Sequence, residues 1–101
     1  MLGFGNLGGV IMVLEDKGHL EIKYCSVWNY FNVASWIGAE FNGEFGGDIR
    51  ITLTPVTEGR LEVYLDGSLI FDRKKAGKYP GLPEVKQMKL DAQEQIPALA
   101  K

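Results

Sequence analysis

The sequence predicts a small α/β (α+β) domain with the order strand, helix, strand, strand, strand, helix. Apolar and polar residues alternate in four short runs, and two longer stretches repeat apolar residues at three- and four-residue spacing. Glycine or proline separates these runs. The chain has 101 residues, 46% of them hydrophobic, which is enough for one core. We therefore expect a four-stranded mixed sheet with two helices packed on one face.

The first strand and the first helix follow each other closely. Residues 20–25, LEIKYC, alternate with the period of a strand that buries one face. After S-V-W-N-Y, apolar residues recur along one helical face as far as Phe45. Ser26 or Asn29 is expected to cap the start of this helix, and the glycine pair at 46–47 lets the chain leave it in a left-handed conformation.

Three more strands follow the first helix. Residues 49–54 alternate until Pro55 removes a backbone donor and ends the run. A strand, helix and strand joined by short links normally place both strands parallel. Residues 61–65 alternate again, an Asp-Gly pair at 66–67 predicts a tight hairpin, and residues 69–73 return as its second strand.

A basic cluster and a closing helix complete the domain. The cluster consists of Arg73, Lys74, Lys75 and Lys78. Such a run can attract an acidic partner or the carboxylates of glutathione, but a solvated loop is its commoner explanation. The helix begins near Pro83, which suits a first helical turn, and ends before Pro97.

Composition excludes several classes of protein. A net charge of -2 supplies no positive field for nucleic acid or an anionic membrane, and no apolar run reaches the roughly 18 residues of a membrane helix. A single cysteine excludes an internal disulfide and a cysteine-rich zinc site, and the lone His19 beside one thiol makes a poor ligand set. We expect no metal, no nucleic acid, no membrane and a cytoplasmic location.

Residues 1–19 are expected to form an extension ahead of a single domain at 20–101. The first fourteen residues are apolar and rich in glycine, but they lack the basic start and cleavage pattern of a secretory signal. A flexible arm, an extra strand and sequence upstream of a natural start at Met12 all stay open. An exposed strand edge or this arm would allow a weak homodimer as well as a monomer.

Cys25 is the one candidate redox centre. It is predicted to end the first strand just before the helix, where free N–H groups and the helix dipole favour a thiolate, the species that attacks disulfides. In dithiol enzymes a second thiol lies three residues later; here that residue is Trp28, whose bulk disfavours the thiolate by excluding water. Both a reactive monothiol and a buried bystander stay open.

Two segments resemble the selenoprotein W-like group, also called the Rdx family, in the selenoprotein T/W/H set. They are EIKYCSVWNY at 21–30 and GRLEVYLDGSLIFDRKKAGKYPGLPEV at 59–85. The specific matches are Y-C-x-x-x-x-Y and G-x-x-E-V-x-x-D-G-x-L-I-x-x-R-K. The resemblance extends from Leu20 to the last helix and implies a compact thioredoxin-like domain. Residues 57–60 lack the proline that larger thioredoxins place opposite their active cysteine.

The resemblance implies thiol-redox chemistry at a motif of cysteine, two residues, and selenocysteine or a second cysteine. The motif falls on Cys25, Ser26, Val27 and Trp28, so its partner position holds tryptophan. This implies a thiol oxidoreductase that acts through a monothiol, forms a mixed disulfide with glutathione or a protein thiol, and needs no other cofactor. Selenocysteine as the natural residue at position 28 is an open alternative, because its codon differs from that of tryptophan by one base.

The alternative function is a non-catalytic protein-interaction module that has lost the redox pair. A protein partner would then contact the loop from Cys25 to Trp28, because exposed tryptophans are favoured interface anchors. Packing of Trp28 over the vacated position is the simpler expectation. Tyr30 and Tyr79 are expected in the core or at its edge, with their hydroxyls in water.

Overall fold

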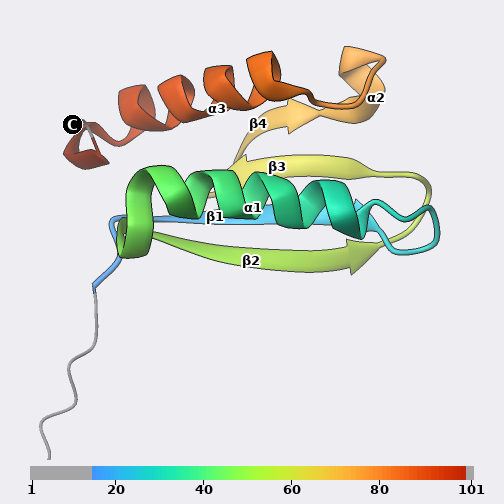
Figure 1. Ribbon diagram of the computed structural model, residues 1–101, viewed down its shortest axis with the longest axis horizontal. Coiled ribbons are helices and arrows are strands. Elements are labelled where there is room, and N and C mark those ends of the chain that lie inside the picture. Colours follow the sequence, from blue (N-terminus) through green and yellow to red (C-terminus); the bar gives the residue numbers. More distant parts are fainter. Residues whose placement is uncertain (1–14, 100–101) are drawn as a thin grey trace, which may run out of the picture.

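The computed structural model describes residues 15–99, which form one sheet with helices on one face (Figure 1). Its elements are β1 (Gly18–Cys25), α1 (Phe31–Phe45), β2 (Ile49–Val56), β3 (Leu61–Leu65), β4 (Ser68–Asp72), α2 (Arg73–Ala76) and α3 (Leu82–Gln95). Single 3₁₀ turns at Gly46–Asp48 and Pro97–Leu99 follow α1 and α3. The predicted element order is confirmed, and α2 is an unpredicted addition. The first fourteen residues of the expected extension lie outside the described residues.

The sheet is mixed, with the strand order β2-β1-β3-β4. β1 runs parallel to β2, as the crossover predicted, and antiparallel to β3, which pairs antiparallel with β4. Asp66 and Gly67 have φ values of 49° and 84°, the positive values that a two-residue hairpin turn requires. The predicted fold class is therefore confirmed.

The core lies between the sheet and the two long helices. α1 packs on β1 and β2, while α3 packs on β4 and α1. The fully buried side chains include Leu20, Ile22, Ile37, Phe41, Leu61, Val63, Leu65 and Val85. Leu20 and Ile22 are alternate residues of β1, so the period that predicted this strand also places its apolar side under α1.

His19 and Glu21, which alternate with these residues, lie on the opposite face of the sheet and pair with hydroxyls of β2. His19 Nε2 lies 2.8 Å from Thr52 Oγ1, and Thr54 Oγ1 donates to the Glu21 carboxylate at 2.7 Å. No group of three or more histidine, cysteine or acidic residues in the described part of the chain could hold a metal. Within the same part, no helix is long and apolar enough to cross a membrane.

The start of α1 differs from the prediction. Its N-cap is Tyr30, whose side chain makes no capping hydrogen bond, so the proposed caps Ser26 and Asn29 are wrong. Asn29 has a φ of 61°, which places it in the left-handed region, and its side chain accepts a hydrogen bond from Asn32 at 3.4 Å. A turn at 26–30 therefore separates β1 from the helix.

Two strand ends differ as well. Pro55 stays inside β2 opposite Tyr24. Proline is tolerated there because β2 is an edge strand and pairs with a neighbouring strand on one side only. The missing N–H donor therefore costs no hydrogen bond to a strand on the other side. The last strand ends at Asp72, whose carboxylate accepts the backbone N–H of Lys74 at 3.0 Å and caps α2. Arg73 thereby moves from the predicted strand to the first position of a helix.

Candidate functional site

The site lies at the end of the molecule where β1 stops, at the right in Figure 1. The backbone N–H of Cys25 donates to the Arg60 carbonyl at 2.7 Å, and that of Ser26 donates to the Val56 carbonyl at 3.3 Å. These bonds join the end of β1 to the β2–β3 loop. Cys25 is 2% exposed, so its thiol lies beneath the turn at 26–30 rather than on the open surface.

The environment of Cys25 combines opposing effects on its thiol. Burial raises the pKa of Cys25, but hydrogen bonding from the backbone at Val27, Gly59 and Trp28, together with the positive charge of Lys74, outweighs burial and leaves the pKa lowered. These backbone donors belong to the turn and to the β2–β3 loop. The sequence predicted that N–H groups in the first turn of α1 would favour the thiolate. This prediction is wrong, because the helix begins only at Phe31.

Trp28, at the partner position of the motif, is 59% exposed. One part of its indole lies over Gly59, where an added Cβ would be 2.8 Å from Trp28 Cζ3. The indole also meets the Tyr30 ring edge-on, with centroids 6.0 Å apart. Packing thus accounts for part of the Trp28 ring, and the rest faces solvent.

Gly59 lies in the β2–β3 loop. Its φ is 67°, a conformation that glycine adopts without steric cost. Its backbone interacts with Cys25 on one side, and its carbonyl accepts Arg73 Nε and Nη2 at 3.3 and 3.1 Å on the other. Sequence reasoning did not identify Gly59 as a site residue; the available signals were its place in the loop that follows the second strand and at the first position of the G-x-x-E-V motif.

Two tyrosines and an arginine lie against one another next to the β2–β3 loop. Tyr30 is 2% exposed, and its hydroxyl lies 3.1 Å from the hydroxyl of Tyr79, so the expectation that the Tyr30 hydroxyl lies in water is wrong. The hydrogen bond between the two tyrosine hydroxyls, together with burial, raises the pKa of Tyr30. The guanidinium of Arg73 lies 5.6 Å from the Tyr30 centroid and 5.9 Å from that of Tyr79.

The basic cluster divides into members with different surroundings. Arg73 contacts Gly59 and both tyrosines, and Lys74 contributes to the electrostatics of Cys25. Lys78 instead forms an exposed ion pair with Glu84 at 2.7 Å. The solvated-loop interpretation therefore fits Lys78 and does not fit Arg73.

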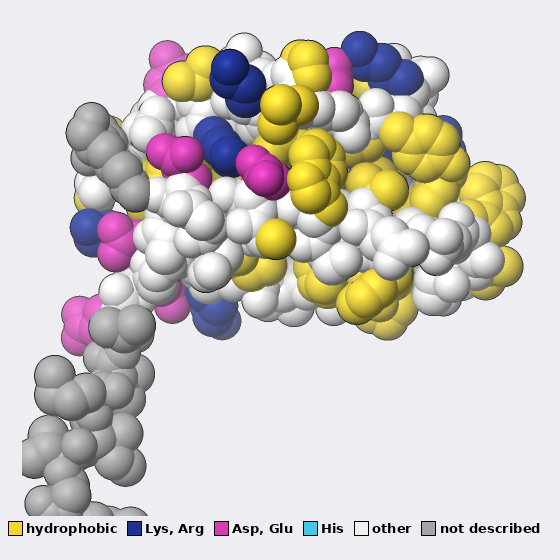
Figure 2. Space-filling view, viewed as in Figure 1, with side chains coloured by type: hydrophobic (Ala, Val, Ile, Leu, Met, Phe, Trp, Pro, Cys, Tyr) yellow, Lys and Arg dark blue, Asp and Glu magenta, His cyan; other side chains and the backbone are white. Residues whose placement is uncertain are grey.

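Large apolar side chains are exposed around this end of the molecule. We call Val27, Trp28, Phe31 and Tyr79 the apolar rim; their exposed fractions are 76%, 59%, 50% and 55%. Figure 2 shows hydrophobic side chains gathered at the end that carries the turn, with basic side chains above them. Exposed aromatic side chains of this kind mark contact surfaces.

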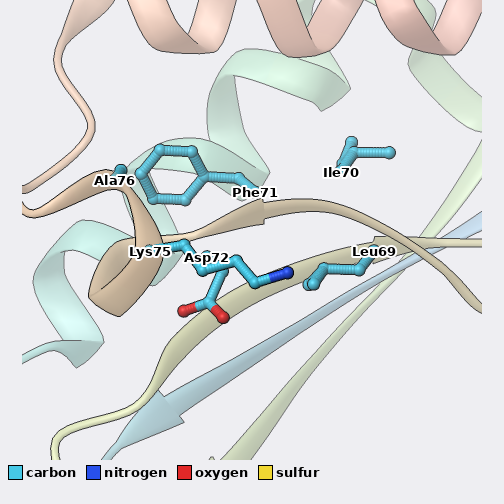
Figure 3. A pocket seen from close by; sticks show the side chains of 6 residues that line it. All are labelled: Leu69, Ile70, Phe71, Asp72, Lys75 and Ala76. Atoms are coloured by element: carbon cyan, nitrogen blue, oxygen red, sulfur yellow. The ribbon is translucent and has the colours of Figure 1, made fainter.

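A separate groove follows the outer edge of β4 (Figure 3). It is lined by Leu69, Ile70, Phe71, Asp72, Lys75 and Ala76. The Lys75 side chain extends along the groove toward Leu69. Cys25 is not part of this lining, so the thiol and the apolar rim form the candidate site.

A mixed four-stranded sheet with two main helices and a thiol at the end of its first strand defines a thioredoxin-like domain. The chain belongs to the Rdx family, whose family model matches residues 19–90. The crystal structure of a selenoprotein W-related protein from Vibrio cholerae is similar, with 30% identity and a TM-score of 0.72, covering 80% of this chain and 99% of that one. A crystal structure from Bordetella parapertussis has 28% identity and a TM-score of 0.68, covering 73% of this chain and 95% of that one. No match was found among curated proteins.

Proposed function

We propose that this Rdx-family protein is a thiol-redox protein that acts through Cys25 alone and forms a mixed disulfide with glutathione or a protein thiol. The observation that supports this most is the set of backbone donors around the Cys25 sulfur, which lowers its pKa despite burial. A thiol with a lowered pKa remains a thiolate at more acidic pH than an ordinary thiol, and the thiolate is the reactive form. Family membership supports the same chemistry.

The reaction needs one thiol of the protein and one disulfide. The Cys25 thiolate attacks one sulfur of oxidised glutathione; a protein–glutathione disulfide forms, the original disulfide breaks, and glutathione leaves as a thiolate that takes a proton from water. A second glutathione thiolate reverses the step and restores Cys25. Since Cys25 is 2% exposed, the turn at 26–30 must open before a disulfide reaches the sulfur.

Treatment with oxidised glutathione is expected to add one glutathione to the chain, at Cys25. Mass spectrometry of the intact protein and of its peptides measures the adduct. Cys25→Ser is the negative control and should form no adduct, because the chain contains a single cysteine. Wild-type Cys25 is expected to react with an alkylating reagent at pH values well below those at which an ordinary thiol stops reacting. No adduct, together with the alkylation profile of an ordinary thiol, contradicts the proposal.

A second candidate is the non-catalytic interaction module, which the exposure of the apolar rim favours. Val27 and Phe31 flank Trp28 in the sequence and are at least half exposed, so a partner could bury all three side chains together. In this case the burial of Cys25 is structural and the thiol takes no part in binding.

Two variants separate the candidates when bound proteins are captured on immobilised chain. The module predicts that Cys25→Ser retains partners that Trp28→Ala loses. The redox proposal predicts that Trp28→Ala retains partners held by disulfides and that Cys25→Ser loses them. A reducing wash also releases these partners. Loss of the same partners in both variants counts against the module.

A further inference from the structure

Arg73 connects α2 with the loop that lies beside the thiol. Its Nε and Nη2 donate to one acceptor, the Gly59 carbonyl, at 3.3 and 3.1 Å. The guanidinium also lies against the rings of Tyr30 and Tyr79. The guanidinium is planar, and it is held by two hydrogen bonds to one carbonyl and by contact with two rings. It therefore restricts the orientation of that carbonyl more than a lysine ammonium can.

Gly59 is the residue through which this restraint can reach the sulfur. With a φ of 67°, it directs its carbonyl toward Arg73, and the next residue, Arg60, accepts the backbone N–H of Cys25 at its own carbonyl at 2.7 Å. The Trp28 indole covers the position of the missing side chain. Gly59 therefore has contacts on both sides, and the contact from Arg73 is the one made by a helix, α2.

We propose that Arg73 is a positioning residue that holds the β2–β3 loop at Gly59 against the end of β1, where the Cys25 sulfur lies. The proposal rests on the Cys25 thiolate of the proposed function and names a residue that controls it. Arg73 acts through the carbonyl of Gly59, whereas Lys74 acts on the thiolate by its charge.

Other titratable groups near the thiol come from the neighbouring elements. Lys74 of α2 favours the thiolate, and Tyr30 of the turn interacts with it while remaining neutral. Arg60 is the last residue of the β2–β3 loop, and its guanidinium is paired with the Glu62 carboxylate at 2.9 Å. None of these groups replaces the contact that Arg73 makes with the Gly59 carbonyl.

Arg73→Lys tests positioning because it keeps the positive charge and loses the fork. We expect Cys25 of this variant to be alkylated about threefold more slowly at neutral pH, with a higher midpoint in its pH profile. Arg73→Gln is expected to show at least the same change. Lys75→Gln is the matched control, because Lys75 lies on the same helix, carries the same charge and lines the outer groove (Figure 3). It should leave the midpoint unchanged.

The amide resonance of Gly59 provides a readout that a merely structural role would not move. In the wild-type protein the chemical shift of the Gly59 amide proton should follow the ionisation of Cys25. This response should be smaller in Arg73→Lys, while the other resonances remain those of the folded protein. The resonance in Cys25→Ser, which cannot ionise, gives the baseline.

The outcomes separate this proposal from the proposed function. An ordinary thiol pKa in the wild-type protein overturns the redox proposal and removes the basis of the positioning role. A low wild-type pKa that Arg73→Lys leaves unchanged overturns the positioning role alone. A rise in Arg73→Gln but not in Arg73→Lys also overturns it, because charge would then suffice.

Discussion

Trp28→Cys is expected to convert the protein from a monothiol into a dithiol that closes an internal disulfide. The backbone of residue 28 already interacts with the Cys25 sulfur, so a thiol on that residue starts close to its target. After Cys25 captures glutathione, the introduced thiolate attacks the Cys25 sulfur, forms the internal disulfide and releases glutathione. The glutathione adduct should therefore be replaced by a species two hydrogens lighter than the reduced variant.

Mass spectrometry and a free-thiol titration measure this conversion. Trp28→Ser is the matched control, because it removes the indole and introduces no second sulfur. It should keep the glutathione adduct that the wild-type protein forms. Two free thiols in Trp28→Cys after equilibration with oxidised glutathione would contradict the expectation, and would mean that the turn holds residue 28 away from the sulfur.

Gly59→Ala is expected to lower the stability of the fold and to raise the pKa of Cys25. An L-residue at a φ of 67° costs about 1–2 kcal/mol. The new Cβ would also lie 2.8 Å from Trp28 Cζ3, so the indole has to move. Because the Gly59 backbone helps to lower the pKa of Cys25, a displaced loop weakens that effect. Urea unfolding and the pH profile of Cys25 alkylation measure the two changes.

Gly67→Ala separates backbone strain from the contacts of the site. Gly67 has a φ of 84°, and an added Cβ there meets nothing within 4 Å. The free energy of unfolding of this variant should fall through backbone strain alone, and the pKa of Cys25 should stay as in the wild-type protein. Trp28→Ala combined with Gly59→Ala should recover the part of the stability loss that is due to the indole. Equal thiol pKa values in Gly59→Ala and Gly67→Ala would contradict the role assigned to Gly59.

Much of the fold follows from patterns that the chain carries locally. Alternation in β1 separates Leu20 and Ile22 from His19 and Glu21, and burial on one face is the physical origin of that period. The Asp-Gly hairpin requires only two residues that tolerate positive φ. Predictions failed where tertiary context competes with local preference. Pro55 stays in a strand because that strand lies at an edge, and Ser26 caps nothing because a turn intervenes before the helix.

By itself, the sequence determined the element order, the mixed sheet, the place of Cys25 at the end of β1 and the tryptophan at the partner position of the motif. Only the tertiary structure decided what surrounds the thiol. Gly59 and Arg73 are 14 residues apart, and Tyr30 and Tyr79 are 49 residues apart, yet each pair is joined by a hydrogen bond. Local periodicity reports which face of an element is buried. Which backbone groups converge on a sulfur depends on how separate loops meet in space, and no local pattern encodes that.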